Sequence, residues 1–108
     1  MAVKIIATMK VAKGREKDLL RLFMELRTKA MSQTGYISGE TLKWISDQEE
    51  FLVISTWKSF EDWKAWEDKP KRREIHAQID AILEKKTLIK AYEYAELEPD
   101  YVSIADAF

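Results

Sequence analysis

The chain of 108 residues contains no cysteine, so disulfide bonds, thiolate nucleophiles and cysteine-ligated metal sites are excluded. It has a single histidine, which excludes the two-histidine spacings of common metal sites. Only three glycines and two prolines are present, and they form neither a glycine-rich phosphate loop nor a nucleophile elbow. Flavin, nucleotide and metal enzymes of the usual types are therefore not expected, and no metal ligand is assigned.

The chain also lacks an excess of either charge. Its 18 Lys and Arg and 19 Asp and Glu are interspersed and give a net charge of -1, so we expect no nucleic-acid or membrane partner. No run of about twenty apolar residues is present. Residues 1–6 lack the apolar region of a signal peptide, and a cytoplasmic location is expected. The hydrophobic fraction of 46% is that of a globular domain.

Hydrophobic periodicity predicts an alternation of strands and helices. The expected strands cover residues 3–11, 36–46, 50–57 and 87–95, with a hairpin turn at residues 47–48. The expected helices cover residues 15–34, the segment between the N-cap Ser59 and the helix breaker Pro70, and residues 71–85. In the first helix, the predicted buried stripe consists of Leu19, Leu20, Phe23, Leu26 and Ala30.

This order of elements is the split β-α-β pattern of ferredoxin-like α+β domains. It predicts a four-stranded antiparallel sheet with the helices on one face. We assign residues 1–95 to this domain. Residues 96–108 are interpreted as a C-terminal tail that packs on a partner subunit.

Both faces of the predicted sheet carry apolar side chains. In the first strand Ile5 and Met9 point to one face, and Ile6 points to the other. In the third strand Val53 and Ile54 likewise point to opposite faces. The helices suffice to cover one face only, and an exposed apolar face is rare in monomers. The sequence therefore predicts a homodimer in which two sheets pack face to face.

His76 is the first candidate for chemistry, because only its side chain has an ordinary pKa near neutrality. It lies at the flank of the apolar stripe of the third predicted helix, and Asp80 follows it by one helical turn. One interpretation is a general base or haem ligand at the mouth of a pocket. The alternative is a half-buried histidine with a carboxylate neighbour and no chemical role.

The aromatic residues around the second predicted helix are the second candidate. Phe60, Trp63 and Trp66 recur at three-residue steps and form either a wall for a flat apolar ligand or part of the core. We predict that Trp63 serves the core and Trp66 the pocket. Arg72 and Arg73, near the start of the third helix, are interpreted as solvated side chains.

Three segments resemble the antibiotic biosynthesis monooxygenase (ABM) domain family across residues 2–95. They are Lys13-Gly14 before an amphipathic helix, residues 35–41 (GYISGET) and residues 53–63 (VISTWKSFEDW). The resemblance implies a dimeric α/β barrel with a pocket between sheet and helices in each subunit. It also implies an oxygenase, because the family includes cofactor-free oxygenases of aromatic polyketides and haem-degrading monooxygenases.

The resemblance extends to individual positions. The haem-degrading branch carries a tryptophan and a proximal histidine with the spacing of Trp66 and His76, but Ala7 stands where that branch has an asparagine. The cofactor-free oxygenases, which form quinones, have no single motif that can be carried over to this chain. The candidate residues for the lining of the pocket are Trp66, His76, Phe23 and Met9.

The leading prediction is a monooxygenase that acts on a flat apolar phenol or quinol without a cofactor, with His76 as catalytic base. The predicted substrate-binding residues are Trp66, Phe23, Met9 and Ala7. One alternative is a haem-binding or haem-degrading protein with His76 as axial ligand. The other is a non-catalytic dimer that binds a small apolar or aromatic ligand.

Overall fold

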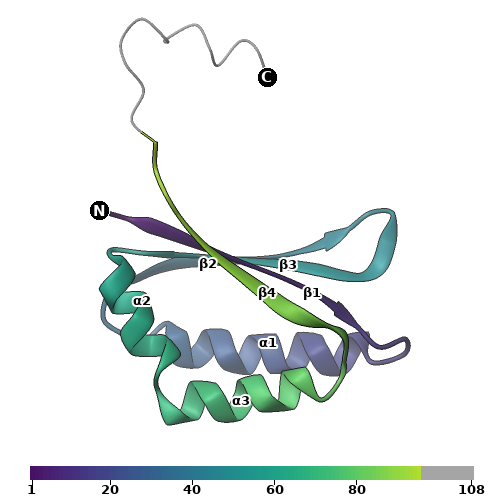
Figure 1. Cartoon of the computed structure of the whole chain (residues 1–108). Coiled ribbons are helices and arrows are strands. Elements are labelled where there is room, and N and C mark those ends of the chain that lie inside the picture. The colour runs from purple at the N-terminus through teal and green to yellow at the C-terminus, as the bar shows by residue number, and fades with distance from the viewer. Residues whose placement is uncertain (96–108) are drawn as a thin grey trace, which may run out of the picture.

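The structure, a computed structural model, describes residues 1–95, which form an antiparallel sheet with three helices on one face (Figure 1). The strands are β1 (Val3–Val11), β2 (Tyr36–Trp44), β3 (Asp47–Trp57) and β4 (Leu83–Glu93). The helices are α1 (Glu16–Ala30), α2 (Phe60–Glu67) and α3 (Pro70–Asp80). The strand order β2-β3-β1-β4 confirms the predicted ferredoxin-like α+β fold. None of the three helices in this part of the chain is long and apolar enough to cross a membrane.

The register of the central strand β1 decides which side chains face the helices. Ala7 pairs with Val53 on β3 and with Ile89 on β4, and this row faces the helices. The next residue, Thr8, pairs with Leu52 and therefore points to the opposite face. The sheet thus has one covered face and one face that no helix covers.

The core fills the space between the helices and the covered face. Leu19 of α1 and Ile75 of α3 are fully buried in one cluster, and Trp57 of β3 is buried in an adjoining cluster. Leu26 packs against both clusters. The edge-to-face pair of Tyr36 and Trp57, with ring centroids 5.3 Å apart, anchors the start of β2 to the core.

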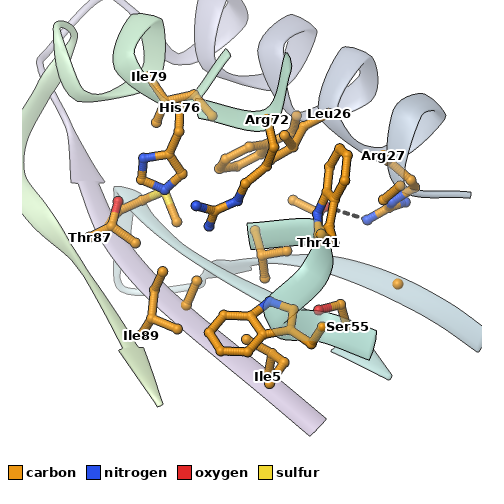
Figure 2. A pocket seen from close by; sticks show the side chains of 18 of the residues that line it. Ile5, Leu26, Arg27, Thr41, Ser55, Arg72, His76, Ile79, Thr87 and Ile89 are labelled. Atoms are coloured by element: carbon orange, nitrogen blue, oxygen red, sulfur yellow. Dashed lines mark hydrogen bonds between the residues drawn. The ribbon is translucent and has the colours of Figure 1, made fainter. Parts of the chain in front are cut away.

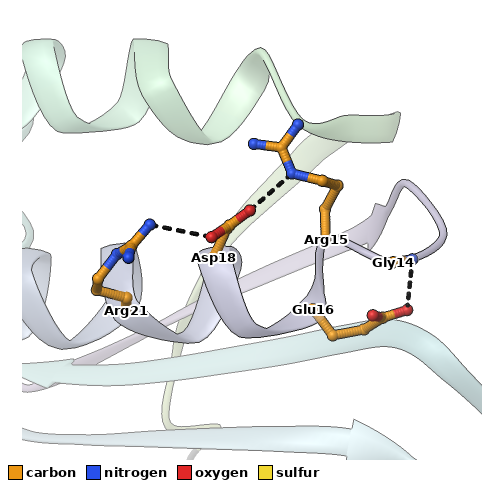
Figure 3. A network of polar contacts seen from close by, with 5 residues as sticks. All are labelled: Gly14, Arg15, Glu16, Asp18 and Arg21. Carbon is orange, nitrogen blue, oxygen red and sulfur yellow. Dashed lines mark hydrogen bonds and ion pairs between the residues drawn. The ribbon is translucent and has the colours of Figure 1, made fainter.

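The turn before α1 shows how local polar contacts fix the helix start (Figure 3). Gly14 has a φ of 85°, and its N–H donates to Glu16 at 3.2 Å. Asp18 accepts hydrogen bonds from Arg15 at 2.7 Å and Arg21 at 3.0 Å. The acidic residues lie in the first turn of α1, where the helix dipole favours negative charge.

The predicted buried stripe of α1 was wrong at one position. Leu20 is 43% exposed, whereas Leu22 is buried. Three- and four-residue steps from Leu19 lead to Leu22 and Phe23, and Leu20 lies about 100° from Leu19 around the helix. The helix also ends at Ala30, earlier than the predicted residue 34.

The β-hairpin and the α3–β4 connection also differ from prediction. The hairpin turn lies at Ile45 and Ser46, and Asp47 already belongs to β3. The helix predicted to reach residue 85 ends at Asp80, because Leu83 begins β4 by pairing with Val11 of β1. Backbone pairing with the central strand prevails here over the helix-like spacing of Ile79, Ile82 and Leu83.

The uncovered face of the sheet is rich in apolar side chains. Leu42 of β2 and Leu88 and Tyr92 of β4 are 46%, 56% and 48% exposed, respectively. Ile6 and Ile54 lie between them as a cross-strand pair and are partly buried by their neighbours. The predicted alternation of the strands is therefore present, while the homodimer inferred from it stays a prediction. The tail predicted to reach a partner, residues 96–108, lies outside the described residues.

Candidate functional site

A cavity of about 100 Å³ lies between the helices and the covered face of the sheet. Its floor comes from β1 and β3, through Ala7 and Val53 among others, and its roof comes from all three helices. An apolar cavity of about 150 Å³ takes a benzene molecule. The cavity is therefore of the order of one aromatic ring in size, and a larger ligand must extend out of it.

All five predicted site residues line this one cavity. Ala7 and Met9 come from β1, Phe23 from α1, Trp66 from α2 and His76 from α3. The turn at Asp68 and Lys69 orients α2 and α3 so that Trp66 and His76 converge. Their catalytic or binding roles stay predictions.

The structure does not separate the two tryptophans into one core residue and one pocket residue, as was predicted. Trp63 and Trp66 are both buried in the core, and both line the cavity. Phe60 is 43% exposed and does not line it. The two tryptophans thus act as core residues whose remaining surface forms a wall of the cavity.

His76 extends from α3 toward the sheet (Figure 2). Its side chain is 21% exposed, and its Nδ1 lies 3.5 Å from Oδ1 of Asp80. Burial and the neighbouring positive charge of Arg72 lower the pKa of His76, and the Asp80 carboxylate opposes them only partly. The ring is therefore neutral at pH 7. The Asp80 carboxylate beside Nδ1 favours the tautomer with its proton on Nδ1, which leaves Nε2 as the basic nitrogen.

Arg72 lines the same cavity, although the sequence pattern favoured a solvated side chain. It lies one helical turn before His76, and Figure 2 shows both side chains entering the same space from α3. Burial lowers the pKa of the Arg72 guanidinium, which still remains charged. The missed signal was the four-residue spacing of Arg72 and His76, which places both on one helix face. Arg73, the next residue, is exposed and contacts Asp68 at 3.2 Å.

Two buried polar atoms of the cavity lining have no protein partner. They are Nε of Arg72 and Oγ1 of Thr87, and no other buried side-chain nitrogen or oxygen of residues 1–95 is unpaired. Thr87 lies on β4, on the same side of the cavity as His76 (Figure 2). An unsatisfied buried polar group costs on the order of 1–3 kcal/mol, so each such group calls for an explanation, such as a bound water, ion or ligand.

The opposite end of the cavity is closed by a satisfied polar contact. Arg27 of α1 donates a hydrogen bond from Nη2 to Thr41 of β2 at 2.7 Å (Figure 2). Gly39 has no Cβ, so the side chains of Tyr36 and Arg27 can lie close to its backbone. A Cβ at this position would lie 2.6 Å from Oη of Tyr36 and 3.3 Å from Nε of Arg27.

The cavity therefore has an apolar middle and two polar ends. The end with Thr41 belongs to β2, and the end with Thr87 belongs to β4, the two outer strands of the sheet. Three strand spacings separate them, which is roughly 14 Å at about 4.8 Å each. Only the β4 end has unpaired polar atoms, so the two ends differ in what they offer a ligand.

Haem fits this cavity poorly. His76 carries a neutral nitrogen suited to iron, but the cavity volume of about 100 Å³ is much smaller than a haem macrocycle. Ala7 has no hydrogen-bond donor for a ligand on the far side of the iron. Within residues 1–95, no three His, Asp or Glu side chains are grouped to hold a metal ion.

Comparison with known proteins places the chain in a protein family. The sequence model described as antibiotic biosynthesis monooxygenase matches residues 2–78. No curated protein matches the chain with significant similarity.

Solved structures share the fold at low sequence identity. A conserved protein from Methanosarcina mazei is 18% identical, with a TM-score of 0.83 over 88% of this chain and 94% of that one. SnoaB, a cofactor-independent oxygenase from Streptomyces nogalater, is 12% identical, with a TM-score of 0.80 over 91% and 97%. Rv0793 from Mycobacterium tuberculosis is 14% identical, with a TM-score of 0.80 over 90% and 98%.

Proposed function

Because the chain belongs to the antibiotic biosynthesis monooxygenase family, we propose that it is a cofactor-independent monooxygenase of a flat, electron-rich phenol or quinol. The observation that carries the proposal is a neutral histidine at one end of an apolar cavity walled by tryptophans. The likeness in fold to SnoaB, a cofactor-independent oxygenase, supports a reaction without a bound cofactor.

The reaction needs only a base, an apolar site and dioxygen. Nε2 of His76 takes the proton of the substrate hydroxyl, and the resulting phenolate is electron-rich enough to reduce dioxygen directly. The ring carbon para to the oxygen then forms a bond to dioxygen, and the peroxide oxygen receives the proton from His76. The O–O bond then breaks, and the outer peroxide OH leaves as water with the hydrogen of that same para carbon. This leaves a quinone, so one oxygen atom enters the product and the other leaves as water. The substrate supplies all four electrons.

The other predicted residues hold the ring in place. The indole of Trp66 and the phenyl ring of Phe23 provide apolar contact from the helix side, and Met9 and Ala7 form the floor. The small side chain of Ala7 leaves room beside the ring for dioxygen. Burial of Trp66 and Phe23 excludes water from the reacting carbon.

We further propose that the active form is a homodimer built on the uncovered sheet face. The exposed side chains of Leu42, Leu88 and Tyr92 would be buried by a second copy of the same face. Leu42, Trp44 and Leu52 line a shallow depression there, which favours interdigitation of two copies.

The test is oxygen consumption by purified, metal-chelated protein against a panel of hydroxynaphthalenes and related quinols. His76→Ala is expected to lower turnover on any active substrate by about 10²–10⁴-fold, the range for a general base. Gln78→Ala, an exposed change on the same helix, is the matched control and should retain full turnover. Full turnover in His76→Ala would refute the role of His76. Tight binding without oxygen consumption would instead identify a non-catalytic binding protein.

A further inference from the structure

The two buried polar atoms without a protein partner, Nε of Arg72 and Oγ1 of Thr87, both line the cavity, and Thr87 marks its β4 end. They come from different elements, α3 and β4, that face each other across this end (Figure 2). One buried donor without a partner can be a packing compromise. Two that line the same space, beside a histidine, indicate a place for a ligand atom.

We propose that Arg72 and Thr87 form a binding site for one anionic oxygen of an aromatic ligand, with the ring lying in the apolar middle of the cavity. The ligand class is a phenolate or an aryl carboxylate. The inference rests on the proposed function for treating this cavity as the substrate site. It goes further in naming the ionised form as the species bound and Arg72 as the specificity determinant.

The charges around this end favour an anion. Nε of Arg72 can only donate, and the hydroxyl of Thr87 can donate as well, so both groups suit an anionic oxygen as acceptor. None of the ion pairs among residues 1–95 includes Arg72, whereas its neighbour Arg73 is paired with Asp68. The carboxylates near Arg72 are those of Glu67, Asp68 and Asp80, which act on it at longer range. A cationic ligand would be repelled by the guanidinium, and an ether oxygen would lack the charge that a guanidinium prefers.

The arrangement also places the base next to the anion that it creates. His76 and Arg72 line the same end, so the oxygen that loses its proton to His76 lies where Arg72 and Thr87 receive it. Arg72 then stabilises the phenolate before dioxygen reacts. Arg72 is thus a substrate-binding residue at this end, and Arg27 is not equivalent to it because Arg27 already donates to Thr41.

The test uses 4-nitrophenol, a single-ring phenol whose ionised form has its own absorption band, so that binding and ionisation are read together. The wild-type protein is expected to lower the apparent pKa of bound 4-nitrophenol by about one unit, which is a tenfold preference for the anion. Arg72→Gln is expected to abolish this shift and weaken binding of the anion about tenfold or more. Arg73→Gln, one position along the same helix, should leave both unchanged.

A second probe and a second variant separate the inference from loss of fold. The neutral 4-nitroanisole has the same ring but no ionisable oxygen, and Arg72→Gln should bind it as well as the wild type does. Thr87→Val keeps the shape of the side chain and should weaken anion binding several-fold without affecting 4-nitroanisole.

The inference is overturned if the wild type binds 4-nitroanisole as tightly as the anion, or binds neither. It is also overturned if Arg72→Gln or Thr87→Val retains wild-type anion affinity. Anion binding that depends on Arg72, with no oxygen consumed on any phenol, would sustain the inference and refute the proposed oxygenase function.

Discussion

Arg72 and His76 lie one turn apart on α3, and both side chains enter the cavity between the helices and the sheet. The positive charge of Arg72 is one reason why the pKa of His76 lies below its ordinary value, after burial. The pair therefore keeps the histidine unprotonated and presents a cation beside it. This combination suits an acidic hydroxyl that must be ionised and then held.

The first prediction concerns the titration of His76, which a single histidine makes easy to follow by NMR. Its midpoint is expected below 6.5, because burial and Arg72 both disfavour the charged ring. Arg72→Gln should raise the midpoint by removing a positive neighbour. Asp80→Asn should lower it further by removing the carboxylate that favours the charged form. Activity should rise with pH through the same midpoint and then level off. Identical midpoints in all three proteins would contradict this account of the site.

The sequence predicted the type and order of the helices and strands better than it predicted the polar groups of the cavity. Strand alternation and the helix breaker Pro70 were sufficient for the order of elements, because these signals are local. Whether Trp66 and His76 would meet depended on the angle between two helices, which no local pattern specifies. Arg72 was misjudged because adjacent basic residues usually lie in solvent, and only its spacing from His76 distinguished it from Arg73.

Leu83 shows a second limit of sequence-based prediction. Its spacing from Ile79 continues the apolar face of α3, so a helix was expected to include it. In the structure Leu83 instead pairs with Val11 at the far end of β1. Ala12 N–H also donates to the carbonyl of Ile82 at 2.9 Å. A pairing between segments about seventy residues apart cannot be read from a local period.

The second prediction concerns stability and uses two adjacent leucines of α1. Leu19 is fully buried and Leu20 is 43% exposed. Leu19→Ala is expected to lower the free energy of unfolding by about 2–5 kcal/mol, since it leaves a cavity in the core. Leu20→Ala should cost less than about 1 kcal/mol. Urea denaturation of both variants measures the two losses in free energy of unfolding. Equal losses would contradict the burial of Leu19 and the exposure of Leu20 on α1.

The third prediction concerns assembly. A charge at the centre of the uncovered sheet face, as in Ile54→Glu, should prevent dimer formation because it would be buried without a partner. Met24→Glu is the matched control, because Met24 is 72% exposed on α1, on the helical side of the molecule. Sedimentation velocity is expected to show a dimer for the wild type and the control and a monomer for Ile54→Glu. A monomeric wild type at micromolar concentration would rule out the proposed assembly.

The fourth prediction concerns haem. Titration of the wild type with haemin should give no Soret shift that depends on His76, because the cavity beside His76, of about 100 Å³, is too small for the macrocycle. His76→Ala and the wild type should therefore give superimposable spectra. A shifted Soret band in the wild type that His76→Ala abolishes would make the histidine an axial ligand, and the reaction proposed above would lose its base.

The central claim is that the substrate itself, ionised in this cavity, reduces dioxygen. The most direct measurement is mass spectrometry of the product formed under isotopically labelled dioxygen by metal-chelated protein. The account predicts one labelled oxygen atom in the quinone and loss of labelled product in His76→Ala. Product oxygen derived from water, or labelled product formed equally well by His76→Ala, would contradict it.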